Sequence, residues 1–76
     1  MFVVTRTVSV TTQLLAHDIN QAHLLAAQTR ADIRQAGSRV EILAPDGVFI
    51  IGWCFDGQCW TGYVGADSQA GTLPLR

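Results

Sequence analysis

Residues 39–64 read RVEILAPDGVFIIGWCFDGQCWTGYV and contain the two hairpin turns that decide the fold. The first turn is Ala44-Pro45-Asp46-Gly47, with proline at its second position and a glycine that can adopt the left-handed conformation. The second turn is Asp56-Gly57, a two-residue hairpin signal. Together the two turns predict three antiparallel strands, over residues 39–44, 48–55 and 58–64.

The register of these strands decides which side chains face the core, because alternate residues of a strand point to opposite faces. With a three-residue loop at 45–47, Ile42 pairs with Ile50, and in the second hairpin Cys54 pairs with Cys59. The smaller, uncharged set of side chains is predicted to lie under a helix: Val40, Ile42, Ala44, Val48, Ile50, Gly52, Cys54, Cys59, Thr61 and Tyr63. The remaining set is predicted to form an open face: Arg39, Glu41, Leu43, Phe49, Ile51, Trp53, Phe55, Gln58, Trp60 and Val64. A slip of one residue would exchange the two faces.

The helix that covers this sheet is predicted over residues 19–36, which are rich in alanine and contain neither proline nor glycine. Asp18 is the expected N-cap, because Gln21 follows three residues later as in a capping box. Gly37 stands where a helix commonly ends in the left-handed conformation. The core-facing stripe at helical spacing comprises Ile19, Ala22, Leu25, Ala26, Thr29 and Ile33.

The chain begins with an alternating pattern over residues 1–11, which predicts a half-buried strand. One face of that strand carries Phe2, Val4, Val8 and Val10. Residues 13–16 either continue this strand or bend into a second short one.

Length and composition indicate one small domain. The chain has 76 residues, of which 49% are hydrophobic and 14% charged, with a net charge of −1. We therefore predict a single α+β domain over residues 1–64, followed by a C-terminal tail or edge segment over 65–76. Its antiparallel sheet of three to five strands carries one helix packed on one face, in β-α-β-β order. A core of this size cannot hide so much apolar surface, so part of that surface is expected to face a partner.

Charge and hydropathy argue against several classes of protein. All five basic residues are arginine, whereas nucleic-acid-binding proteins usually carry a basic excess. No apolar run reaches the roughly 18 residues that a membrane-spanning helix needs. No charged-then-apolar leader opens the chain. We therefore expect a cytoplasmic protein without membrane contact.

The residues that most often carry chemistry do not form a recognisable site. His17 and His23 have no further ligand at metal-binding spacing and are expected to be surface histidines. Cys54 and Cys59 face each other across the predicted turn, where an oxidising environment would permit a cross-strand disulfide. In the cytoplasm we expect them to be reduced and buried. Because no nucleophile–base–acid set and no glycine-rich phosphate loop is present, we expect no enzymatic activity, no cofactor and no metal.

The open face is therefore the predicted site, and its function is to bind another protein. Aromatic residues and arginine supply most interface hot spots. The predicted partner-binding residues are Phe49, Trp53, Phe55 and Trp60, with Arg39 and Glu41 at the rim. Two alternatives remain open: a homo-oligomer that covers this face with its own copy, and a sheet that stacks single-stranded nucleic acid on Trp53 and Trp60.

Part of the sequence resembles a family of small phage-encoded anti-CRISPR proteins. The resemblance begins at Thr12-Gln13-Leu14-Leu15-Ala16, and continues on the helix at Gln21-Ala22 and Ala26. It then follows a strand, a turn that ends in Gly47, an apolar strand, Asp56-Gly57 and Trp60. The family that this pattern is similar to acts on type I-F systems and is built from an antiparallel sheet and one helix.

The resemblance implies a stoichiometric inhibitor that docks on a CRISPR surveillance complex in the host bacterial cell and blocks pairing of guide RNA with target DNA. In that family, basic residues on the helix contact nucleic acid. The matching positions here are His23, Leu24 and Gln28, which are not basic. This departure favours an inhibitor that contacts only protein.

Overall fold

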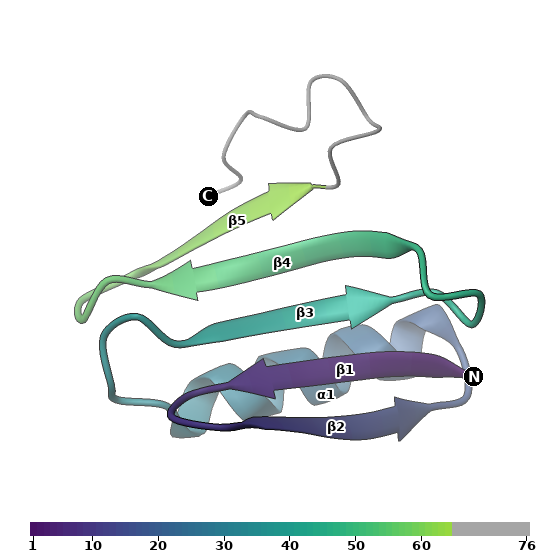
Figure 1. Ribbon diagram of the computed structural model, residues 1–76, viewed down its shortest axis with the longest axis horizontal. Coiled ribbons are helices and arrows are strands. Elements are labelled where there is room, and N and C mark those ends of the chain that lie inside the picture. The colour runs from purple at the N-terminus through teal and green to yellow at the C-terminus, as the bar shows by residue number, and fades with distance from the viewer. Residues whose placement is uncertain (65–76) are drawn as a thin grey trace.

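The computed structural model describes residues 1–64 and contains a five-stranded antiparallel sheet with one helix (Figure 1). The strands lie side by side in the order β2-β1-β3-β4-β5. The predicted α+β class is confirmed, although two strands rather than one precede the helix. The predicted tail, residues 65–76, lies outside the described residues. The elements are β1 (Phe2–Thr7), β2 (Thr11–Ala16), α1 (Ile19–Asp32), β3 (Arg39–Leu43), β4 (Phe49–Phe55) and β5 (Trp60–Val64).

The N-terminal segment forms a hairpin, and the expectation of one strand over residues 1–11 is wrong. The chain reverses after Thr7, where the backbone N–H of Val8 donates to the Val10 carbonyl at 3.1 Å. Thr11 then pairs with Thr7, and Ala16 with Phe2. The alternation of apolar residues runs on through the turn, which is why the pattern hides the reversal. The second short strand foreseen near residues 13–16 is present as part of β2.

Helix α1 begins as predicted and ends four residues early. The Asp18 carboxylate accepts a hydrogen bond from the backbone N–H of Gln21 at 2.8 Å. The Gln21 side-chain carbonyl in turn accepts a hydrogen bond from the backbone N–H of His17. At the other end, Ile33 is already in extended backbone, and the Arg34 guanidinium donates to the Ala31 carbonyl at 2.7 Å. The predicted stripe is confirmed, since Ala22, Ala26, Thr29 and Ile33 are buried and Ile19 and Leu25 partly so.

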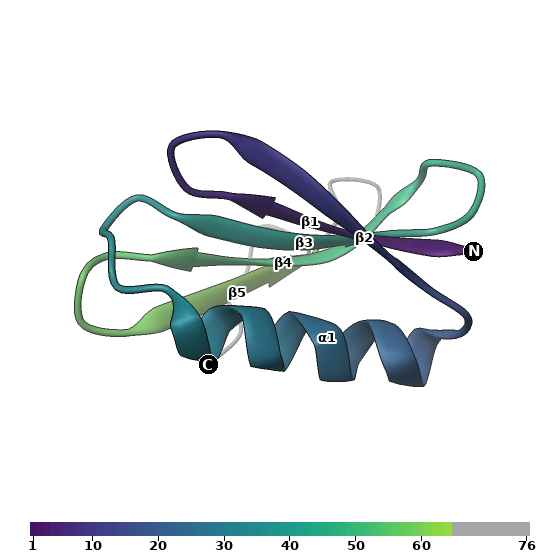
Figure 2. The same cartoon turned by 90° about the horizontal axis from the view of Figure 1, so that it is seen from below.

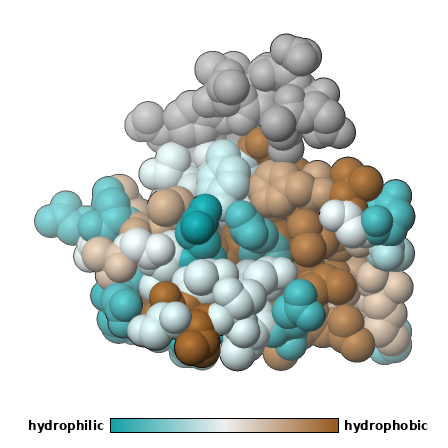
Figure 3. All heavy atoms as spheres, in the orientation of Figure 1, coloured by the Kyte–Doolittle hydropathy of each residue, from teal (hydrophilic) through white to brown (hydrophobic). Residues whose placement is uncertain are grey.

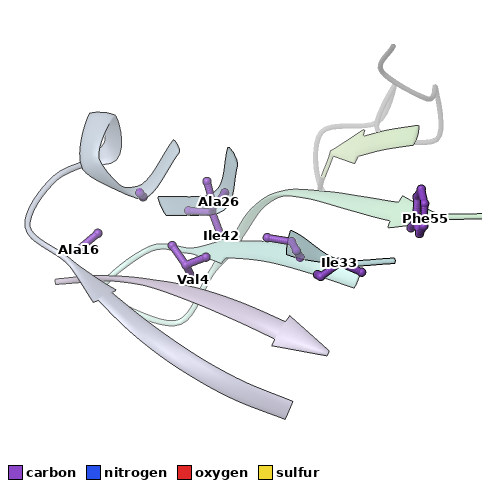
Figure 4. Packing of buried hydrophobic residues seen from close by; sticks show 8 residues of the cluster. Val4, Ala16, Ala26, Ile33, Ile42 and Phe55 are labelled. Carbon is purple, nitrogen blue, oxygen red and sulfur yellow. The ribbon is translucent and has the colours of Figure 1, made fainter. Parts of the chain in front are cut away.

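The core lies between α1 and the β1–β3 part of the sheet. Figure 2 shows the helix lying along one face of the sheet, and its contacts fall on β1, β2 and β3. Figure 4 shows side chains from both layers meeting in this space. The alanines of the helix allow close approach to the larger side chains of the strands. The buried hydrophobic residues are Val4, Ala16, Ala22, Ala26, Ile33, Val40, Ile42 and Phe55.

A β-bulge between β3 and β4 corrects the predicted register. Ile42 pairs with Ile51 and Leu43 pairs with Phe49, so that Ile50 is an extra residue in β4. From Ile51 onward, every side chain of β4 therefore lies on the face opposite to the one predicted. The prediction was correct for β3, whose Val40 and Ile42 are fully buried, and for Phe49. It was wrong for Ile51, Trp53, Phe55, Trp60 and Val64, which share the face that carries α1, and for Gly52, Cys54, Thr61 and Tyr63, which lie on the open face.

The second hairpin turn is longer than predicted. Phe55 pairs with Trp60, which leaves four residues in the loop. The Asp56 carboxylate holds the loop by accepting the backbone N–H groups of Gln58 and Cys59, at 2.8 and 2.9 Å. These bonds favour the ionised carboxylate and lower the pKa of Asp56.

The longer loop also separates the two cysteines. Cys54 lies opposite Thr61, and Cys59 belongs to the loop. Both thiols are free and exposed, so the predicted pairing of buried cysteines is wrong.

Candidate interaction surface

The sheet face opposite α1, here called the open face, is covered by no helix or strand of the described residues. Its side chains form transverse rows, because directly paired residues of neighbouring strands share a face. One row is entirely apolar and crosses four strands from β2 to β4. Figure 3 views this face and shows hydrophobic residues gathered toward the right, where β1 begins and β3 ends. We call this row the apolar row; it comprises Leu15, Val3, Leu43 and Phe49.

The next row of the open face is largely polar and ends at Tyr63 on β5. The Tyr63 hydroxyl donates a hydrogen bond to Glu41 Oε2 at 2.8 Å, across the intervening strand β4. Gly52 makes this path possible, since a Cβ at that position would lie 2.6 Å from Cζ of the Tyr63 ring. Phe49 stacks on the same ring, with centroids 5.6 Å apart and planes 11° apart. The apolar row is thus joined to a fixed polar group.

The electrostatic surroundings keep the Tyr63 phenol protonated. Burial, the hydrogen bond to Glu41 and the negative charge of Glu41 all raise the pKa of Tyr63 well above its usual range, while Arg39 opposes this more weakly. Tyr63 therefore remains a hydrogen-bond donor at neutral pH. The exposed guanidinium of Arg39 lies one row further along β3 and adds a positive charge to the surface.

A second aromatic group lies on the other face, beside the helix. We call it the tryptophan ledge; it consists of Trp53, Phe55 and Trp60. The Arg30 guanidinium lies 3.9 Å from the centroid of the Trp53 ring, which is a cation–π contact, and His23 meets the same ring edge-on at 6.0 Å. Phe55 and Trp60 stack on each other at 4.9 Å.

Arg30 has an unusual environment for a charged side chain. Its Nη1 atom is buried and has no hydrogen-bond partner among the described residues. Desolvation lowers the pKa of the guanidinium from its ordinary value. The face of Trp53 supplies the electrostatic compensation that a carboxylate would supply elsewhere. The ledge is therefore a packed junction between α1 and β4 as much as a surface.

The structure divides the six predicted partner-binding residues between these two places. Arg39, Glu41 and Phe49 lie on the open face, as expected. Trp53, Phe55 and Trp60 lie on the ledge, and their expected position on the open face is wrong because of the bulge at Ile50. Sequence reasoning missed three members of the open-face surface, namely Val3, Leu15 and Tyr63. For Tyr63 there was a usable signal, since a glycine inside an apolar strand marks close approach by a neighbour.

The described residues offer surfaces rather than a cavity. They contain no pocket and no group of three or more His, Cys, Asp or Glu side chains that could hold a metal ion. His17 and His23 are exposed, as expected. Within the same range, no helix is long and apolar enough to cross a membrane. This arrangement can bind another molecule across the open face or along the edges of the sheet.

Comparison with known proteins returned no matching protein family, no similar curated protein and no similar solved structure.

Proposed function

We propose that this protein is a non-enzymatic inhibitor that acts by binding another protein through the open face. The observation that carries the proposal is the apolar row, which crosses four strands of a face that no described element covers. Apolar patches with a polar rim are typical of protein interfaces. Glu41, Arg39 and the Tyr63 hydroxyl provide such a rim on the same face.

The open face suits binding because it is already organised. Its side chains project from paired strands, and Phe49 and Tyr63 hold each other by stacking. A partner that docks there orders few side chains, which reduces the entropic cost of association. We expect Phe49 and Leu43, at the centre of the surface, to contribute most of the affinity, and Arg39 to contribute mainly to the rate and specificity of association.

The specific target that we propose is a CRISPR surveillance complex in the bacterial cytoplasm. This choice rests on the resemblance of the segment from Thr12 to Trp60 to type I-F anti-CRISPR proteins. Because His23, Leu24 and Gln28 replace the basic helix residues of that family, the contact is proposed to be with a protein subunit and to block target DNA indirectly.

The proposal is tested by adding the purified protein to a type I-F surveillance complex and measuring binding of target DNA by gel shift. We expect inhibition that saturates near one protein per binding site. Leu43→Lys places a charge in the apolar row and should abolish inhibition. Leu24→Lys is the matched control, since Leu24 is a surface leucine of α1 with 57% exposure.

Circular dichroism shows whether both variants remain folded. Full DNA binding in the presence of excess folded wild-type protein would exclude this target. Equal inhibition by the two variants would exclude the open face as the contact surface.

Single-stranded nucleic acid is the weaker alternative. The two tryptophans that were expected to stack bases lie on the ledge, where Trp53 is already covered by Arg30. Phe49 and Tyr63 remain on the open face but stack on each other. Salt-sensitive binding of oligonucleotides at low ionic strength would revive this alternative.

A further inference from the structure

Strand β2 is an edge of the sheet and is exposed along nearly its whole length. It pairs with β1 on one side, and no described strand pairs with its other side. Thr11 to Leu15 are all exposed, and Ala16 alone is buried. Such an edge presents a row of backbone N–H and C=O groups that can pair with another strand.

This edge lacks the features with which proteins usually protect themselves from pairing. Residues 11–16 include no charged residue and no proline, and the ladder to β1 runs without a bulge. Leu14 is 43% exposed on the helix side of the sheet, and Leu15 is 64% exposed on the open face. An edge strand with a leucine on each face offers apolar contacts above and below any strand that joins it.

We propose that β2 pairs with β2 of a second copy of this chain, in antiparallel orientation about a two-fold axis perpendicular to the sheet. The two five-stranded sheets then form one continuous sheet, with both α1 helices on the same face. This inference concerns the backbone edge of β2 rather than the open face, although Leu15 belongs to both, and it does not depend on the proposed function. A second copy fits because a two-fold interface brings the same uncharged strand against itself, without juxtaposing like charges.

The antiparallel ladder restricts the register of this dimer to two choices. Along an edge strand, only alternate residues direct their backbone groups outward. Two residues that face each other across the two-fold axis therefore have both odd or both even numbers. The axis passes midway between one central residue and its own copy on the neighbouring strand. The greatest overlap of β2 with itself places that residue at Gln13 or at Leu14. The first register pairs residues 11–15, and the second pairs residues 12–16.

The two registers are distinguished by charge. Gln13→Lys in the first register, or Leu14→Lys in the second, places two lysines directly opposite each other, where like charges are destabilising. The controls carry the same changes on exposed residues of α1: Gln28→Lys matches Gln13→Lys, and Leu24→Lys matches Leu14→Lys. The association constant is measured by sedimentation equilibrium over a concentration series, with circular dichroism to check the fold.

We expect the wild-type protein to reach twice the chain mass of 8.2 kDa, and the two controls to behave like it. The variant at the central residue should weaken the dimer roughly tenfold or more, and the other edge variant less. A wild-type protein that remains monomeric into the millimolar range would overturn the proposal. So would a dimer that neither edge variant weakens, or one that the control variants weaken as much as the edge variants.

Discussion

The two hairpins at opposite ends of the sheet are stabilised in different ways. The β1–β2 hairpin lies under α1, and its Val4 and Ala16 are completely buried among aliphatic neighbours. The β4–β5 hairpin extends beyond the main contacts of the helix, and its aromatic side chains pack largely on one another. Burial under the helix should therefore dominate the stability of the first region, and precise side-chain fit that of the second.

The largest expected effect lies in the region covered by the helix. Ile42→Ala removes a completely buried side chain from β3 and should lower the free energy of unfolding by about 2–5 kcal/mol. Urea denaturation followed by circular dichroism measures the loss. Its neighbour Leu43→Ala, on the open face, is the control and should cost clearly less. Equal costs would show that the helix side of β3 does not form the main core.

The next effect lies in the aromatic hairpin and depends on fit. Gly52→Ala introduces a Cβ 2.6 Å from the Tyr63 ring, which must move away from Glu41. We expect a cost of roughly 1–3 kcal/mol in unfolding free energy, as for other overpacked sites. In a Tyr63→Ala background the same change should cost much less, because the ring is gone. An unchanged cost in that background would contradict the close approach.

The helix cap provides a smaller test of the covered region. Asp18→Ala removes the acceptor for the Gln21 backbone N–H and should cost about 1 kcal/mol. Asp18→Asn keeps an acceptor and should restore most of the stability. Thermal denaturation of the three proteins measures this difference. Equal stability of the alanine and asparagine variants would argue against a capping role.

The smallest effect is a dependence on pH in the aromatic hairpin. The folded pKa of Tyr63 is raised, so the stability it contributes is complete below the unfolded value of about 10 and is lost as pH rises through the folded value. Tyr63 is the one tyrosine of the chain, so its ionisation can be followed by near-ultraviolet absorbance. Glu41→Gln should bring the titration closer to the usual range. A wild-type titration at the ordinary value would contradict the hydrogen bond to Glu41.

Sequence reasoning was most successful where one local signal was sufficient. The Asp18 cap and the buried stripe of α1 follow from side-chain chemistry and helical period, and both were found. The faces of β3 were also correct, because the charged Arg39 and Glu41 alternate with the aliphatic Val40 and Ile42.

It failed where one residue changed the register of everything after it. No residue type marks Ile50 as an extra residue, and the choice between a two-residue and a four-residue loop after Phe55 depends on the Asp56 side chain capturing two backbone N–H groups. The bulge alone places Trp53 and Trp60 on the face that carries α1, and the longer loop brings Trp60 opposite Phe55. Neither could be deduced from the alternation of β4 alone.

The bulge also marks where this sheet can change in length. Phe49 is already opposite Leu43, and Ile51 is already opposite Ile42. A chain that lacked Ile50 would therefore keep the rest of β4 on its present faces, with a regular ladder in place of the bulge. Because residues 50 and 51 are both isoleucine, deletion of either gives the same sequence. A deletion from Gly52 onward would instead turn part of the strand over, so evolutionary gain or loss of one residue is best tolerated at the bulge.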